Sequence, residues 1–310
     1  MRLSASLPLI LAAACAHGDK APAPPAPQQQ VPPPDLPAVF AGTLPCADCP
    51  GIETRLVFLD PARYVLAERF LEREVEPRFS SGAWVLEGET LRLADRAFRW
   101  DGETLLALDA GGKPIPVQGR NTLSPGEAPT LAFGTIRRTT DGLKLEPCGG
   151  GARIEVVDGT AHLSQAIEEL PGSFVELVAL PAGEQLWAVD LQRIAMEGPG
   201  CEQLPTGLVA RASGNEPFWG LEIDQRSLRL ERLGQDPVGT PWAPFRWERG
   251  AYRYFADAGE TRLGVVLTPG FCPDTMAPVA TGYRAEVEVN GEKLQGCAWL
   301  GTEWKRLDGP

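Results

Sequence analysis

Short runs of alternating apolar and polar residues, separated by turn signals, constrain the fold of this chain most. Side chains of a β-strand point alternately to opposite faces, so such runs predict antiparallel strands with one buried face. Asp-Gly and Asn-Gly pairs, which favour tight hairpins, stand at 101–102, 141–142, 158–159 and 290–291. The runs themselves are 55–59, 83–86, 90–93, 98–100, 153–157, 174–178, 186–189, 228–231, 262–267 and 283–289.

Helical periodicity is nearly absent from the chain. Residues 162–170 alone suggest a helix, and Pro171 ends it. The predicted class is therefore all-β, with small antiparallel barrels or sandwiches in series after a signal peptide and a proline-rich linker. No repeat at a fixed period is evident, which argues against a solenoid or a propeller.

Turn-rich stretches predict where the domains begin and end. Residues 125–129 and the region near 203–206 are such stretches. The predicted segments are a lipoprotein signal peptide (1–14), a lipidated cysteine with a proline-rich linker (15–35), a β-barrel (36–124), a small β domain of the OB type (130–202) and a C-terminal β domain (206–310).

The N-terminus predicts export and lipidation. Arg2 precedes an apolar run from Leu7 to Ala14, and Cys15 follows this run as in a bacterial lipobox. The alternative is an ordinary signal peptide with an incidental cysteine. No later segment approaches the about 20 apolar residues that a spanning helix needs. We therefore expect membrane attachment through a lipid on Cys15, and sorting to the outer membrane because Ala16 follows it.

Cysteine arithmetic supports export. The chain has 7 cysteines, and a lipidated Cys15 leaves an even number that can pair in an oxidising periplasm. Many connectivities are open in principle, but the placement of the cysteines favours one local pair in each predicted segment. The expected disulfides are Cys46–Cys49, Cys148–Cys201 and Cys272–Cys297.

The net charge of −12 makes this chain a poor candidate for nucleic acid, whose phosphates require clustered lysine and arginine. Such an acidic body attracts cations or basic partners through its summed field. The simpler alternative is that the charge only keeps an exported protein soluble.

Cys46 and Cys49 are separated by two residues and bounded by Pro45 and Pro50. Three roles remain open for the pair: a redox dithiol, a soft-metal site and a structural clip. Thioredoxin-type reactivity needs the first cysteine at a helix N-terminus, and an extended run follows here. Reduced thiolates beside Asp48 suit Cu(I) but leave zinc under-coordinated. We expect modest Cu(I) binding at best and no required cofactor.

Residues 42–52 read Gly-Thr-Leu-Pro-Cys-Ala-Asp-Cys-Pro-Gly-Ile, and further matching segments follow at 63–66, 79–84 and 105–112. This frame resembles the N-terminal domain of the copper-resistance lipoprotein family NlpE over about residues 36–124. The resemblance implies a small β-barrel on an outer-membrane lipoprotein, linked to copper tolerance and to envelope-stress signalling through a two-component sensor. The two cysteines of the family motif correspond to Cys46 and Cys49.

The C-terminal segment carries a second, weaker pattern at 212–219, 272–276 and 294–298, similar to an uncharacterised META-like β domain of exported proteins. Trp219 and Glu216 form a ligand-binding edge in one interpretation. In the other, Trp219 is a core residue beside a disulfide.

No nucleophile elbow, zinc-protease motif or phosphate loop occurs, and His162 stands alone. The acidic pairs Glu72/Glu74 and Glu286/Glu288 sit at strand spacing, as many acids do by chance. We expect a non-enzymatic envelope lipoprotein that acts in copper tolerance or stress sensing, with an envelope protein or stress sensor as partner. The alternative is a ligand- or protein-binding or inhibitor module acting through residues 206–310, and a thiol oxidoreductase is a weaker third hypothesis.

Overall fold

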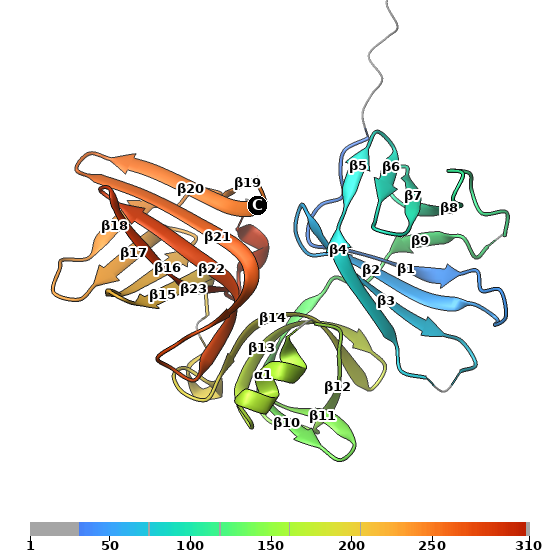
Figure 1. The fold of residues 1–310 in the computed structure, drawn as a ribbon, viewed down its shortest axis with the longest axis horizontal. Helices are drawn as coiled ribbons and strands as arrows, with labels where there is room; N and C mark the ends of the chain where they lie inside the picture. The colour runs from blue at the N-terminus through green and yellow to red at the C-terminus, as the bar shows by residue number, and fades with distance from the viewer. Residues whose placement is uncertain (1–30, 74, 118, 161, 205, 308–310) are drawn as a thin grey trace, which may run out of the picture. The chain divides into compact units, whose positions relative to one another are not determined.

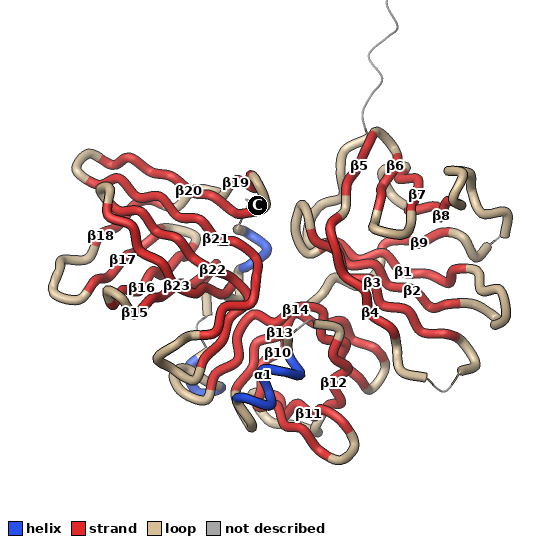
Figure 2. Tube along the Cα trace, in the orientation of Figure 1, coloured by secondary structure: helices blue, strands red, loops and turns tan. Residues whose placement is uncertain are grey.

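The computed structural model describes residues 31–73, 75–117, 119–160, 162–204 and 206–307. Strands account for most of the trace in Figure 2, and the predicted all-β class is confirmed. The predicted signal peptide and Cys15 lie outside the described residues. Within them, no helix is long and apolar enough to cross a bilayer.

The first nine strands form one antiparallel, barrel-like sheet, called here the N-terminal barrel (Figure 1). Its order is β4-β3-β2-β1-β9-β8-β7-β6-β5, so the first strand pairs with the last. Its free edges are β4 and β5, which are consecutive in sequence. The bounds are β1 Ala38–Leu44, β2 Ile52–Phe58, β3 Arg63–Phe70, β4 Arg78–Ala83, β5 Val85–Glu87, β6 Thr90–Arg92, β7 Ala97–Trp100, β8 Leu105–Leu108 and β9 Thr122–Pro125.

The predicted run 83–86 is thus divided between β4 and β5 rather than forming one strand. The break follows from Trp84, which is buried and donates its backbone N–H to the carbonyl of Ala62 at 2.9 Å. Its indole N–H reaches the carbonyl of Asp60 at 3.0 Å. Both bonds turn the chain out of the ladder and leave the sheet open there.

The last nine strands repeat the same strand order and are called the C-terminal barrel. From β18 to β19 the order is β18-β17-β16-β15-β23-β22-β21-β20-β19, which matches the N-terminal barrel strand for strand. The bounds are β15 Leu208–Asn215, β16 Phe218–Asp224, β17 Ser227–Arg232, β18 Val238–Pro241, β19 Arg246–Glu248, β20 Ala251–Ala258, β21 Thr261–Pro273, β22 Val279–Val289 and β23 Glu292–Leu300, followed by the 3-10 helix η2 Trp304–Arg306.

Local details repeat as well. After the second strand of the N-terminal barrel, the Asp60 carboxylate accepts the backbone N–H groups of the residues two and three positions later, at 2.9 and 2.7 Å. Asp224 does the same after β16, at 2.6 and 2.7 Å. Trp242 follows the fourth strand of the C-terminal barrel and donates its backbone N–H to Arg226, as Trp84 does to Ala62. The chain therefore contains a repeat of topology that has no fixed period in sequence.

Strands β10–β14 form the middle sheet together with one helix. The bounds are β10 Thr130–Thr139, β11 Gly142–Pro147, β12 Ile154–Asp158, α1 Leu163–Glu169, β13 Phe174–Ala182, β14 Gln185–Ala195 and the 3-10 helix η1 Cys201–Gln203. Helix α1 lies where the sequence predicted it. The Asp158 carboxylate accepts the backbone N–H of Ser164 at 2.9 Å and so satisfies a donor of the first turn.

The middle sheet continues directly into the C-terminal barrel, as the neighbouring β14 and β22 of Figure 1 show. Residues 193–195 of β14 pair antiparallel with residues 279–281 of β22. At Gly282 a Cβ would lie 2.2 Å from the carbonyl oxygen of Leu191, so only glycine allows the two strands to approach this closely.

Two strands of the N-terminal barrel are buried on both faces. Leu56 and Phe58 of β2 point into the barrel and pack with its aromatic core. Val57, between them, is equally buried, but it packs against the hydrophobic cluster that includes the middle sheet. Val65 on β3 lies in the same cluster. The part of the outward face of β2 and β3 around these residues is therefore an internal surface of the protein, whereas Arg69, farther along β3, is exposed.

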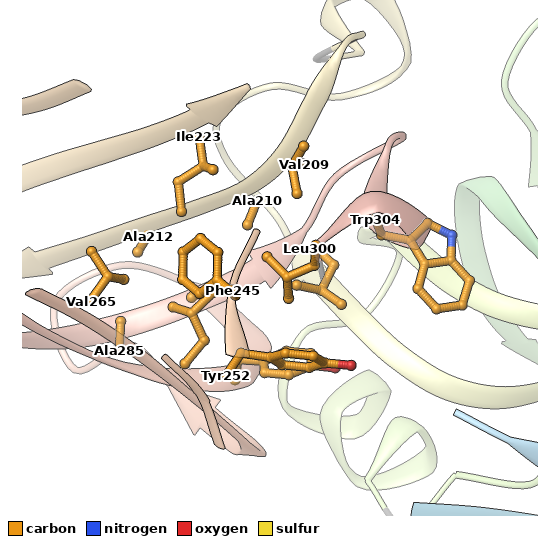
Figure 3. Close-up of a cluster of buried hydrophobic side chains, with 14 of the residues drawn as sticks. Val209, Ala210, Ala212, Ile223, Phe245, Tyr252, Val265, Ala285, Leu300 and Trp304 are labelled. Atoms are coloured by element: carbon orange, nitrogen blue, oxygen red, sulfur yellow. The ribbon is translucent and has the colours of Figure 1, made fainter. Parts of the chain in front are cut away.

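The C-terminal barrel has an apolar interior made by strict alternation. In β22, residues from Tyr283 to Val289 are alternately buried and exposed, as expected for a half-buried strand. Figure 3 shows the result, with Val265, Ala285 and Leu300 pointing toward Phe245 inside the barrel. Trp304 of η2 lies in the same cluster.

Residues 31–310 group as one compact unit. The division into domains near 125 and 205 therefore stays a prediction, and the two barrels and the middle sheet are named by their strands.

Candidate functional site

The Cys-x-x-Cys loop joins β1 to β2. Cys46 and Cys49 form a disulfide with an S–S distance of 2.08 Å and a Cα–Cα distance of 5.3 Å. Both cysteines are half-buried, whereas Ala47 and Asp48 between them are exposed. The motif thus lies at the end of a rigid hairpin with its two middle residues facing solvent.

Two glycines permit this geometry. A Cβ at Gly51 would lie 2.4 Å from the Thr43 methyl group across the hairpin. A Cβ at Gly42 would lie 2.5 Å from the carbonyl oxygen of Thr122 on β9. Gly42 is therefore required for close backbone approach, whereas at Gly51 glycine leaves room for the Thr43 side chain. Both glycines belong to the stretch on which the resemblance rests.

Two arginines from other loops hold the cysteine loop. Arg73, between β3 and β4, forms an ion pair with Asp48 at 2.8 Å. Arg120, before β9, donates a hydrogen bond to the carbonyl of Pro50. The backbone N–H of Leu71 adds a bond to the Gly51 carbonyl at 3.0 Å. Sequence reasoning missed both arginines, because nothing near them in the chain points to the cysteines.

This surrounding charge matters for the chemistry of the pair. A cation near a thiol favours the thiolate, which is the form that exchanges disulfides and binds metal. Arg73 pairs with the Asp48 carboxylate, which lies 3.5 Å from the Cys46 sulfur, and so offsets the negative charge beside the cysteines.

The ligand atoms of Cys46, Asp48 and Cys49 lie within 4.8 Å of one another, and these three residues are the only such group found in the described part of the chain. The cysteines must first be reduced, and the Asp48 carboxylate is already engaged by Arg73. Two soft thiolates suit Cu(I), while zinc prefers four ligands. The residues present thus fit a two-thiolate Cu(I) site in the reduced protein, with Cys46 and Cys49 as ligands.

The other cysteines lie away from this loop. Cys148 joins Cys201 with an S–S distance of 2.05 Å and ties the end of β11 to η1. Cys272 joins Cys297 with an S–S distance of 1.99 Å, between β21 and β23.

The structure assigns Trp219 to the core. Its side chain has no exposed surface, and its indole N–H donates to the carbonyl of Gln295 at 3.2 Å. Glu216 lies in the turn between β15 and β16, followed by the cis-bonded Pro217. Trp219 therefore does not form a ligand-binding edge with Glu216.

The acidic pairs differ in their settings. Glu286 and Glu288 are exposed on one face of β22, as the alternation predicted. Glu72 is in a turn after β3 with φ of 58°, so the strand spacing predicted for it is wrong; Glu74 lies outside the described residues. His162 stacks on Phe271 with ring centroids 4.7 Å apart.

The cysteine loop, its glycines, most of β1 and all of β2–β8 fall within a segment known from other proteins. Residues 40–118 match the family model described as the NlpE N-terminal domain. The predicted resemblance to the NlpE N-terminal domain is confirmed for this segment. The resemblance predicted for residues 206–310 stays a prediction.

A curated relative and two solved structures extend the comparison. Lipoprotein NlpE of Escherichia coli K12 is 33% identical over 135 residues, which cover 40% of this chain and 57% of that protein. A putative lipoprotein of Shewanella oneidensis is 27% identical, covers 29% of this chain and 89% of its own, and has a TM-score of 0.28. The Cpx pathway activator NlpE of Escherichia coli is 24% identical, covers 55% and 100%, and has a TM-score of 0.25. With both TM-scores below 0.5, the similarity rests on sequence.

Proposed function

We propose that this chain is a non-enzymatic lipoprotein of the bacterial envelope whose N-terminal barrel takes part in envelope-stress signalling and copper tolerance through the Cys46–Cys49 loop. The match of residues 40–118 to the NlpE N-terminal domain carries the proposal, because that segment includes both cysteines. The partner is an envelope protein, such as a stress sensor. The anchor is a lipid on Cys15, which places the body in the periplasm at the outer membrane.

The geometry of the loop supports a role that depends on the state of the thiols. The exposed Asp48 lies between the cysteines and is held by Arg73. An external dithiol that reduces the disulfide supplies two electrons and two protons and becomes a disulfide itself. This leaves two thiols at the tip of a hairpin that β2 and β9 otherwise keep rigid, and the thiols lose their protons when they bind a metal ion. Cu(I) bound there by Cys46 and Cys49 would change the charge and the shape that a partner meets.

The test compares two disulfide variants in cells that depend on this protein. Cys46→Ala/Cys49→Ala removes the loop disulfide, and Cys272→Ala/Cys297→Ala removes one far along the chain, as the matched control. Growth at rising copper concentration and an envelope-stress reporter are measured for both, after equal amounts of folded protein are shown by immunoblotting. The proposal expects a changed response in the first variant alone.

If both variants gave the same growth and reporter response, the cysteine loop would have no specific role in the function. Cu(I) titration of the purified, reduced protein against a chromogenic competitor tests the metal part separately. Binding that is the same in the parent and in Cys46→Ala/Cys49→Ala would show that these thiols are not the ligands.

A second candidate function is favoured by an open groove of about 1460 Å³ on the C-terminal barrel. It follows the outer face of β20–β23, where Phe255 is 72% exposed between Arg253 and Glu288. A binding or inhibitor module would use this surface. Phe255→Ser should then abolish partner capture by the purified protein, whereas the signalling function should tolerate the change.

A further inference from the structure

Arg63, the first residue of β3, contacts all three groups of strands. Its guanidinium pairs with Asp60 of its own barrel. The same group donates to the Asp190 carboxylate of β14 at 3.4 Å and to the Tyr283 hydroxyl of β22 at 3.0 Å. Asp190 and Tyr283 flank the place where β14 and β22 approach through Gly282. One side chain of the N-terminal barrel thus bridges the seam between the middle sheet and the C-terminal barrel.

The polar network continues beyond Arg63. The side-chain amide of Gln192 donates to Asp190 at 3.0 Å, and its oxygen accepts the backbone N–H of Leu300 on β23 at 3.1 Å. Gln192 and Asp60 are buried. Burial lowers the pKa of Arg63, but Asp190, Tyr283 and Asp60 raise it by more, so the guanidinium stays charged. Charged hydrogen bonds of this kind are stronger than neutral ones.

Comparison with the C-terminal barrel shows that the turn before β3 does not need an arginine at position 63. Asp224 forms the corresponding turn in the C-terminal barrel, and the residue at the place of Arg63 is Ser227. The Asp224 carboxylate accepts two backbone N–H groups, as the Asp60 carboxylate does, but Asp60 also pairs with the Arg63 guanidinium. A serine therefore suffices for the turn, and the guanidinium of Arg63 serves the contact with the other strands.

Around Arg63 the contact is aromatic and in part polar, since Arg55 of the N-terminal barrel also donates a hydrogen bond to the carbonyl of Pro181 on β13. Trp187 of β14 has no exposed surface. Arg55 and Arg69 of the N-terminal barrel lie 4.6 and 5.8 Å from its ring centroid, and Phe79 meets it edge to face at 5.9 Å. Side chains of the N-terminal barrel therefore cover Trp187, and its exposure reports whether that barrel is in place.

We infer that Arg63 is a latch that holds the N-terminal barrel, with its cysteine loop, on the seam between β14 and β22, and that losing this contact releases the barrel without unfolding it. The latch is a conformational device, because release uncovers Trp187 together with the outward face of β2 and β3. It is independent of the proposed function, since it is tested by burial in the purified protein.

The test is hydroxyl-radical footprinting of the full mature chain, with oxidation of single tryptophans read by mass spectrometry. Arg63→Ser copies the residue found at the equivalent turn. The matched control is Arg96→Ser. Arg96 is as exposed as Arg63, at 30% against 29%, but pairs with Glu68 inside its own barrel at 2.8 Å. In Arg63→Ser, Trp187 should be oxidised at least about tenfold faster than in the parent, which is the change expected from losing charged hydrogen bonds.

Two other tryptophans separate release from unfolding. Trp84 is in the core of the N-terminal barrel and Trp219 in that of the C-terminal barrel. Both should stay as protected as in the parent. Tyr283→Phe removes only the hydroxyl and should raise Trp187 oxidation alone, by a smaller factor. The latch is refuted if Trp187 in Arg63→Ser stays as protected as in Arg96→Ser, or if all three tryptophans rise together in both Arg63→Ser and Tyr283→Phe.

Discussion

The ion pair between Arg193 and Glu176 allows a sharp test of the packing in the middle sheet. The two residues face each other on β14 and β13, and their side chains are 2% and 1% exposed. The arginine donates twice to one carboxylate oxygen of Glu176, at 3.0 and 2.8 Å, and once to the carbonyl of Pro199 at 2.7 Å. Its guanidinium also lies 5.1 Å from the ring centroid of Trp299.

Arg193→Met should destabilise the protein strongly. The methionine keeps much of the apolar stem, so the main change is a buried Glu176 carboxylate without its cation. Breaking a buried pair in this way costs about 3–5 kcal/mol. Replacing both residues, as in Arg193→Met/Glu176→Met, removes the unpaired charge and should return the stability to within about 1–2 kcal/mol of the parent.

Arg211→Met provides the matched control. Arg211 lies 5.8 Å from the centroid of the same Trp299 ring, but its ion pair with Glu222 is exposed. Such pairs contribute about 0–1 kcal/mol. Urea unfolding at pH 7 with the disulfides intact gives the three differences from shifts of the midpoint. The reasoning fails if Arg193→Met loses no more than Arg211→Met, or if the double variant is as unstable as the single one.

The loss of stability in Arg193→Met should depend on pH. Burial raises the pKa of Glu176, and Arg193 opposes this, so removing Arg193 raises the pKa further. A carboxyl with a raised folded-state pKa binds more protons in the folded state. Its destabilising effect is complete above the folded pKa and disappears as the pH falls toward the unfolded value of about 4.3. The difference in free energy of unfolding between Arg193→Met and the parent should therefore be smaller at about pH 5 than at pH 7.

Three further predictions concern the anchor, the disulfides and one glycine. Cys15→Ser should release the folded protein from the membrane pellet, and its recovery there after a salt wash would contradict lipid anchoring. Cys148→Ser/Cys201→Ser opens a loop with a sequence separation of 53 and should lower the free energy of unfolding by about 4 kcal/mol. Peptide mapping that joined Cys148 to another cysteine would refute this pairing. Gly296→Ala would place a Cβ 1.9 Å from a backbone oxygen of β15 and should lower the free energy of unfolding by about 1–3 kcal/mol or more. The control is Gly220→Ala, which has open space around it and should lower it by about 1 kcal/mol at most. Calorimetry measures both.

The strands were predictable because their cause is local. A run such as 283–289 alternates apolar and polar residues, and β22 buries every second one of them. The helix at 163–169 was predictable for the same reason, since its apolar spacing and Pro171 are neighbours in sequence. The cysteine loop could be recognised because its glycines, prolines and cysteines are contiguous.

Contacts between distant segments could not be predicted in this way. Arg63 contacts Asp190 and Tyr283 at sequence separations of 127 and 220, and no sequence pattern around position 63 predicts these contacts. Val57 lies between two residues of the barrel core and is itself buried, because residues outside the barrel cover it, and nothing in the run 55–59 indicates that cover. The shared order of the two barrels was hidden because their loops differ in length.

Comparison of the two barrels bears on why Cys46 and Cys49 are present. The C-terminal barrel forms the same strand order with only a short turn, at residues 216–217, between its first two strands. The disulfide between β1 and β2 is therefore not required for this topology. In the chain-entropy model, closing so short a loop stabilises by about 2 kcal/mol, against about 4 kcal/mol for the long loop at Cys148. Of the two disulfides, stability thus accounts less well for Cys46–Cys49, which favours the chemical role that we propose for this loop.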